Sequence, residues 1–368
     1  MNGARIFRDI LPDACARYDG TRPYWRSSPF GKGFPNDESN GNHHQWMVWS
    51  YWKDYKEYAN DTARFVTEFG FQAPANKETF DSVTLLEDRF PQSPVMEHHN
   101  KQIEGTERLI RFQAAHYQVA TSYAEFLYKG QLVQAEALKF AIEHWRRRKF
   151  KTAGSLYWQL NDCWPVSSWA VIDSALMPKA AYYFTKKFFA PVLASFKVKP
   201  GGIELWITND HLEAKKGKLL ITLRSFNGKI LMSKRMNVIL PSNSSKIAAT
   251  IDAKSYSGAD KTTHYLHAGL WIDGELVSEN RHFFVEPKHL QLTAANVRTR
   301  LTGGKSNEFL FAVTTRQFIK NIQIEIEGGN ATLDDNYFDV DAGTSKMVKI
   351  VSELPKEKLL KNIRLRWL

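Results

Sequence analysis

The sequence pattern changes near Ala190, and this change limits the possible fold more than any other feature. Beyond it come short stretches of alternating apolar and polar residues, the pattern of half-buried strands. Asn227-Gly228 and Asp273-Gly274 are residue pairs typical of tight hairpin turns. The stretches are residues 202–210, 218–226, 229–240, 264–273 and 281–287 and, beyond Pro287, residues 309–315, 319–328, 336–340, 346–351 and 363–368. We predict two β-sandwich domains, residues 190–286 and 287–368.

Residues 1–189 instead alternate helix-like and strand-like segments. An amphipathic helix is expected at the start, with Ile6, Ile10, Leu11 and Ala14 along one side, and a long helical stretch from about Pro94 to Lys149. Strands are expected at residues 22–30, 43–52, 64–72 and 154–162. Helices between strands favour a parallel sheet, and four strands are half of the eight that an α/β barrel needs. We therefore predict a multidomain protein in which half of an α/β barrel precedes the sandwiches.

Two of these expected strands end in polar and aromatic side chains. Glu68 follows the first apolar run. Trp158 follows the second, together with Asn161 and Asp162, which are candidates for a supporting role in substrate binding. A carboxylate facing an aromatic platform is an arrangement that sugar hydrolases use. Each residue also has a structural reading: Glu68 could pair with Arg64 or with solvent, Trp158 could be a core residue, and Asn161 and Asp162 could form a turn.

The motifs resemble those of glycoside hydrolase family 2, in particular its β-mannosidases. TEFGFQ at residues 67–72 is similar to the strand that carries the nucleophile, which would be Glu68. RPYWRSSP at residues 22–29 is similar to the fifth strand of the barrel, with Arg26 where proline is common. HQWMVW at residues 44–49 is similar to the sixth strand. The resemblance implies a retaining hydrolase with Trp158 under the sugar, and with Ser28, His44 and Trp46 close to the pocket.

The resemblance extends to the end of the chain, where FFAPV, ITND, ENRHFFVEPK and DNYFDV are similar to two immunoglobulin-like domains. It also identifies a missing feature. The family's acid/base is a glutamate in an Asn-Glu pair on the fourth strand, and no such pair lies between Met1 and Glu68. We therefore expect the chain to be the C-terminal part of a larger enzyme and to be inactive alone. The alternative is a complete chain that has lost activity.

The implied substrate is a β-mannoside oligosaccharide or glycan, with no cofactor. Two alternatives stay open: another family 2 glycosidase, such as a β-galactosidase or exo-β-glucosaminidase, and a non-catalytic carbohydrate-binding protein. The net charge of +11 comes without a nucleic-acid motif, and no apolar run is long enough for a membrane span. No metal is expected, because the neighbours in His43-His44 and in His98-His99 would point to opposite faces of a strand. A homo-oligomer is possible, and the sequence leaves the compartment open.

Overall fold

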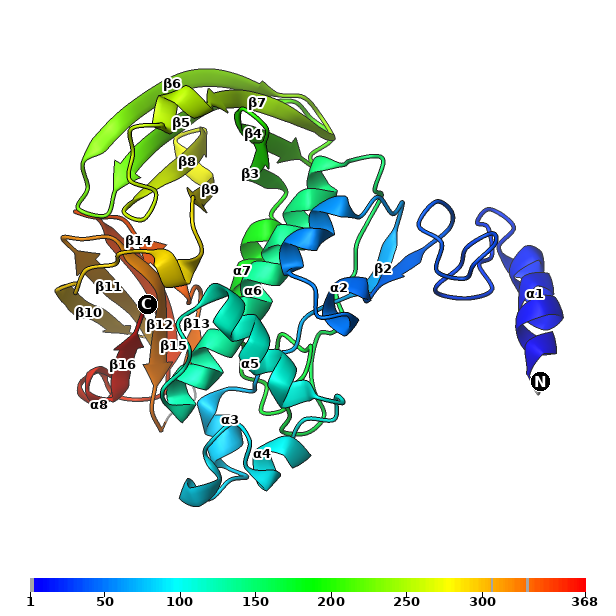
Figure 1. The fold of residues 1–368 in the computed structure, drawn as a ribbon, viewed down its shortest axis with the longest axis horizontal. Coiled ribbons are helices and arrows are strands. Elements are labelled where there is room, and N and C mark those ends of the chain that lie inside the picture. The colour runs from blue at the N-terminus through cyan, green and yellow to red at the C-terminus, as the bar shows by residue number, and fades with distance from the viewer. Residues whose placement is uncertain (1–2, 306, 329–330) are drawn as a thin grey trace.

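The computed structural model describes residues 3–305, 307–328 and 331–368. Figure 1 shows a central group of helices, one β-rich body above them and a second to their left, and the N-terminal helix standing apart at the right. The predicted helix at the start is confirmed as a π-helical turn, Ile6–Ile10, that continues into α1, Leu11–Tyr18. Its apolar residues Ile6, Phe7 and Ile10 are exposed.

A short parallel sheet forms the centre of the N-terminal part. β1, His43–Gln45, pairs in parallel with β2, Val66–Phe69, and places His44 opposite Glu68. The predicted strand at residues 64–72 is therefore confirmed in a shorter form. The segment after Ala153 runs along the other edge of β2, where Ser155 forms a parallel bridge with Val66. The three segments are parallel, as the sequence predicted, but each pairs over fewer residues than the predicted strands contain.

The strand predicted at residues 22–30 is wrong. The segment is irregular, and its pairing is a single bridge between Phe30 and Asn42. Prolines at both ends of the segment restrict its backbone, and Pro29 has no N–H to donate to a ladder. The Ser28 hydroxyl instead bonds to the side chains of Asn42, His44 and Thr67, so this segment is held by side chains.

Two further strand predictions are only partly correct. Residues 43–52 form a strand up to Gln45 and then turn into α2, Met47–Ser50, because the Gln45 side chain accepts a hydrogen bond from the Met47 N–H at 3.1 Å. Residues 154–162 form no regular strand. They hydrogen-bond to β2 at Val66 and Phe69 and then leave the sheet, since the chain beyond Trp158 bonds to residues 169–172.

The long helical stretch predicted from Pro94 to Lys149 is divided into three helices: α4, Pro94–His98, α5, Gly105–His116, and α6, Tyr123–Arg147. A reciprocal cap begins α6. The Ser122 hydroxyl accepts from the Glu125 N–H, and the Glu125 carboxylate accepts from the Thr121 N–H at 2.9 Å. The remaining helical elements of this part are η2, Tyr55–Asn60, α3, Lys77–Asp81, η3, Leu86–Asp88, and α7, Ala180–Phe188.

The first sandwich contains two antiparallel sheets, with strand orders β3-β4-β7 and β6-β5-β8-β9. The strands predicted at residues 202–210, 218–226, 229–240 and 264–273 are present, whereas the one predicted at residues 281–287 overlaps β9 only at residues 281–283. β3 and β7 are additional strands that the sequence analysis did not identify. The bounds are β3 Val192–Lys199, β4 Gly202–Asn209, β5 Lys215–Ser225, β6 Ile230–Leu240, β7 Ser244–Asp252, β8 His264–Ile272 and β9 Glu275–Phe283, with a 3-10 turn at Ala253–Tyr256. Leu205, Ile221 and Leu266 are fully buried between the sheets.

The second sandwich follows a 3-10 turn at Pro287–His289, and its sheets have the orders β10-β11-β15-β13 and β14-β12-β16. Its predicted strands are present, whereas β10, β13 and α8 were not predicted. The bounds are β10 Val297–Lys305, β11 Glu308–Thr315, β12 Ile319–Ile326, β13 Ala331–Leu333, β14 Phe338–Val340, β15 Ser345–Ser352, α8 Lys356–Asn362 and β16 Ile363–Arg366. Val313, Ile322 and Val348 lie at its core.

Helix α6 connects the three parts. The Tyr128 hydroxyl donates to the Asn321 carbonyl at 2.6 Å in the second sandwich, and Glu143 accepts from the Asn280 side chain at 2.8 Å in the first. The same helix buries Leu132, Ala135 and Trp145 against the strands. It therefore supports the sheet that carries Glu68 while contacting both sandwiches. In the described part of the chain, no helix has the length and apolarity that crossing a bilayer requires.

Candidate functional site

The side chains of β1 and the residue after it point alternately to two environments. His43 and Gln45 face Asp61: the His43 Nε2 lies 3.7 Å from Asp61 Oδ2, and the Gln45 amide donates to the same oxygen at 2.6 Å. His44 and Trp46 face Glu68 instead. This alternation is the ordinary geometry of a strand. It places two polar ring systems beside Glu68, the candidate nucleophile.

Glu68 is held in a defined direction. The Trp46 Nε1–H donates to Glu68 Oε2 at 3.0 Å, and the His44 Nδ1 lies 3.3 Å from the same oxygen. Among the described residues, these contacts engage Oε2 and none engages Oε1. The Glu68 side chain is 28% exposed, so the carboxylate remains accessible from solvent. The alternative ion pair with Arg64 is not formed, and the partners of Glu68 are the two rings.

His44 links Glu68 to a hydroxyl group. Its Nε2 lies 2.9 Å from the Ser28 Oγ, which also contacts the Thr67 hydroxyl at 2.9 Å and donates to the Asn42 side-chain oxygen at 2.8 Å. Burial is the main cause that lowers the pKa of His44, and it outweighs the opposite effect of Glu68. The Nδ1 of the ring therefore faces the Glu68 carboxylate, and its Nε2 faces the Ser28 hydroxyl.

The fold thus brings together four residues that are far apart in the sequence and that were expected near one pocket: Ser28, His44, Trp46 and Glu68. Asn42 and Thr67 belong to the same group, and the sequence analysis did not identify them. Thr67 lies beside Glu68 on β2, which is a signal that could have suggested it. Nothing in the local sequence distinguishes Asn42, because loops of this composition are rich in asparagine.

Trp158 lies next to the C-terminal end of β2. Its N–H donates to the Phe69 carbonyl at 2.8 Å, and a Cβ added to Gly70 would meet the Trp158 carbonyl oxygen at 2.4 Å. Glycine at position 70 therefore allows the close approach of the two segments. Trp158 is 44% exposed, in contrast to Trp145, which is 1% exposed. An exposed indole at a strand tip is available to a ligand.

The structure gives Asn161 and Asp162 different surroundings from Glu68. Asn161 is exposed and forms a bridge with Ile172. Asp162 is buried, and its carboxylate accepts from the Ser168 hydroxyl at 2.6 Å. Burial is the main cause that raises the pKa of Asp162, while the nearby Lys179 acts in the opposite direction. These contacts match the turn reading of the two residues, and their role in substrate binding stays a prediction.

Two family models match the C-terminal half of the chain. Residues 201–289 match a model described as a mannosidase Ig/CBM-like domain, and residues 292–368 match one described as an Ig-fold domain of mannosidases. Together with the two seven-stranded folds, these matches confirm the predicted pair of immunoglobulin-like sandwiches. The domain limits at residues 189 and 286 stay predictions.

Several known proteins are similar to the chain over nearly all of its length. Beta-mannosidase B of Aspergillus niger is 29% identical over 96% of the chain, and that of Emericella nidulans is 29% identical over 94%. The crystal structure of a β-D-mannosidase from Dictyoglomus thermophilum superimposes with a TM-score of 0.92 and 35% identity, over 99% of the chain. An exo-chitosanase from Amycolatopsis orientalis shares the fold, with a TM-score of 0.63 at 16% identity over 83% of the chain.

The chain spans less than half the length of these relatives, namely 44% of the A. niger protein and 45% of the D. thermophilum chain. The sequence motifs, the two family models and the superposition agree with one another. In sequence and in fold, the chain corresponds to the C-terminal part of the β-mannosidases of glycoside hydrolase family 2.

Proposed function

We propose that the whole protein, with any sequence beyond these residues, is a retaining exo-β-mannosidase with Glu68 as its nucleophile. The observation that carries this proposal is the Glu68 carboxylate, which is oriented by Trp46 and His44 at the end of a parallel strand. The match at 35% identity to a β-mannosidase supports the choice of glycone. Residues 1–189 would then form the second half of the catalytic barrel.

In this mechanism, Glu68 Oε1 attacks the anomeric carbon of a terminal β-mannoside. The bond to the leaving oxygen breaks, and that oxygen takes a proton from a second carboxylic acid, which the family resemblance places on an earlier strand. The covalent glycosyl-enzyme is then hydrolysed by water, which the second carboxylate deprotonates. Trp46 and His44 orient the nucleophile, because both contact Oε2 and leave Oε1 free to attack. The exposed Trp158 indole packs against the sugar ring.

The function is tested by assaying the whole protein on nitrophenyl β-mannoside, β-galactoside and β-glucosaminide. We expect the mannoside to have the highest kcat/KM, and we expect residues 1–368 alone to release no nitrophenol from any of the three. Preference for the galactoside or the glucosaminide would reassign the glycone. Turnover by residues 1–368 alone, abolished by Glu68→Gln, would show that the acid/base lies within this chain. Sugar binding without turnover by the whole protein would favour the carbohydrate-binding alternative.

Trp46→Phe tests the orientation of the nucleophile. The substitution keeps an aromatic ring and removes the N–H that donates to Glu68 Oε2. A hydrogen bond to a charged group contributes about 1.5–3 kcal/mol, so kcat/KM of the whole protein should fall by about 10–100-fold. Trp25→Phe is the control, because Trp25 is exposed and packs on Phe30. Equal effects of the two substitutions would contradict the role of Trp46.

A further inference from the structure

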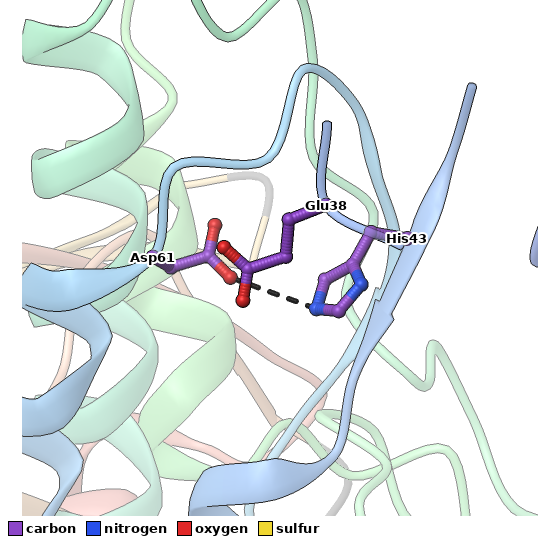
Figure 2. Close-up of side chains that lie close together, drawn as sticks. All are labelled: Glu38, His43 and Asp61. Carbon is purple, nitrogen blue, oxygen red and sulfur yellow. Dashed lines mark ion pairs between the residues drawn. The ribbon is translucent and has the colours of Figure 1, made fainter. Parts of the chain in front are cut away.

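A second group of polar side chains lies on the face of β1 opposite to Glu68. Glu38, from the loop that precedes β1, His43 on β1 and Asp61, which follows η2, direct their donor atoms toward one another (Figure 2). These three atoms lie within 4.8 Å of one another. The group is independent of the proposed glycosidase site, because His44 and Trp46 point to the other face. It combines one imidazole nitrogen with two carboxylates.

The protonation of His43 follows from its contacts. The ring is 3% exposed, and its Nδ1 lies 3.1 Å from the Asn36 carbonyl oxygen. A carbonyl oxygen only accepts, so Nδ1 carries a proton and Nε2 is the ring nitrogen that is available as a metal ligand. That Nε2 has no hydrogen-bond partner and lies 3.7 Å from Asp61 Oδ2. A buried lone pair that faces a carboxylate oxygen is stabilised by a positive charge between the two atoms.

The Asp61 side chain is held in place by three hydrogen bonds. Its Oδ1 accepts from the Trp145 Nε1–H at 2.9 Å and from the Ala63 N–H at 3.1 Å, and its Oδ2 accepts from the Gln45 amide at 2.6 Å. A carboxylate has about four acceptor positions, so one position on Oδ2 remains, beside His43. Within the described residues, the one ion-pair partner of Asp61 is His43.

Glu38 adds a second negative charge to this group. Its Oε2 accepts from the Thr62 N–H and hydroxyl, each at 3.3 Å, which are long hydrogen bonds. No lysine or arginine in the described ranges forms an ion pair with either carboxylate. Two carboxylates close to one another repel, and a bound cation would remove this repulsion.

We propose that Glu38, His43 and Asp61 bind one divalent transition-metal ion, with Zn²⁺ preferred. Zn²⁺ takes histidine nitrogen and carboxylate oxygen at about 2.0–2.2 Å in tetrahedral geometry, which separates neighbouring ligand atoms by roughly 3.3–3.6 Å. The 3.7 Å between His43 and Asp61 is close to this separation. The carbonyl that orients His43 and the donors that hold Asp61 are the outer contacts that metal ligands commonly have. The imidazole favours Zn²⁺ over Mg²⁺ and Ca²⁺.

Such an ion would fasten the loop before β1 to the strand. The same loop ends in Asn42, which contacts Ser28 next to His44. The ion is therefore a structural clamp for the irregular segment beside Glu68 and takes no part in the chemistry at the sugar.

The test is Zn²⁺ binding by the 368-residue protein after treatment with a chelator. Equilibrium dialysis with elemental analysis should give about one tightly bound Zn²⁺ per chain, and the melting temperature should rise when ZnCl₂ is added. Equal concentrations of MgCl₂ and CaCl₂ should leave the melting temperature unchanged. Less than a fifth of an ion per chain would overturn the proposal.

Two variants assign the ion to this group. Glu38→Gln changes a partly exposed loop residue, so the fold should persist, and its Zn²⁺ affinity should fall at least tenfold. His43→Gln should lose the tight site, with tryptophan fluorescence confirming that the protein is folded. Glu57→Gln is the matched control, because it removes the same charge from the exposed face of η2 and contacts Asn60 instead. Tight binding that persists in Glu38→Gln and in His43→Gln would place the ion elsewhere.

Discussion

Alanine in place of Glu68 should lower kcat/KM of the whole protein on a β-mannoside by about 10⁴-fold or more. The substitution removes the atom that forms the covalent intermediate, and the remaining groups cannot replace it. The fold should persist, because the side chain is partly exposed and its partners Trp46 and His44 keep other contacts. Steady-state kinetics and thermal melting, measured on the same preparations, check both parts of this prediction.

External azide should restore part of the activity of Glu68→Ala on a substrate with a good leaving group. The azide ion fills the space of the missing carboxylate and attacks the anomeric carbon, which expels the nitrophenolate and gives a glycosyl azide of inverted configuration. Glu57→Ala, at an exposed position of η2, should retain full activity. Labelling of a different carboxylate by a mechanism-based fluorosugar would contradict the assignment of Glu68.

Trp145→Ala should be the largest stability defect among the tryptophan substitutions. Removing a buried tryptophan costs about 3–5 kcal/mol. Trp145 is 1% exposed, it packs on Phe69 and Tyr58, and its Nε1–H donates to Asp61. The free energy of unfolding of the 368-residue protein, measured by denaturant titration, checks this value.

Trp158→Ala should behave in the opposite way. The residue is 44% exposed, and surface substitutions usually change stability by less than about 0.5 kcal/mol. In the whole protein kcat/KM should fall at least tenfold, because an aromatic contact contributes about 0.5–1.5 kcal/mol beyond the area that it buries. If Trp158→Ala lost stability and Trp145→Ala lost only activity, Trp158 would be a core residue and its place under the sugar would be wrong.

Local patterns in the sequence were sufficient for much of the fold. Alternating apolar residues predicted ten strands of the two sandwiches, because a strand with one buried face shows this alternation whatever its neighbours are. The apolar run around Glu68 predicted a buried strand for the same reason. The strands that escaped prediction, such as β7 and β10, carry many polar and charged residues, so their hydrogen-bonding partners decide their conformation more than their own pattern does.

The same distinction applies to the site: the sequence identified residues, and the structure showed which contacts they make. Glu68, Trp46, His44 and Ser28 were identified from motifs, and the alternation along β1 already separated His43 from His44. Whether Glu68 would pair with Arg64 or with rings, and whether Asp162 would face a pocket or Ser168, could not be read from the sequence. Both questions concern contacts between distant segments.

The sequence by itself determined the order of the parts, the two sandwiches and the identity of the candidate nucleophile, because each of these depends on residues that are close together in the chain. Only the tertiary structure decided that residues 22–30 are irregular, that Trp158 approaches β2 over Gly70, and that Glu38, His43 and Asp61 meet. The physical reason is that hydrogen bonds, ion pairs and close backbone approaches depend on separations of a few ångströms. Such separations between distant segments exist only after the chain has packed.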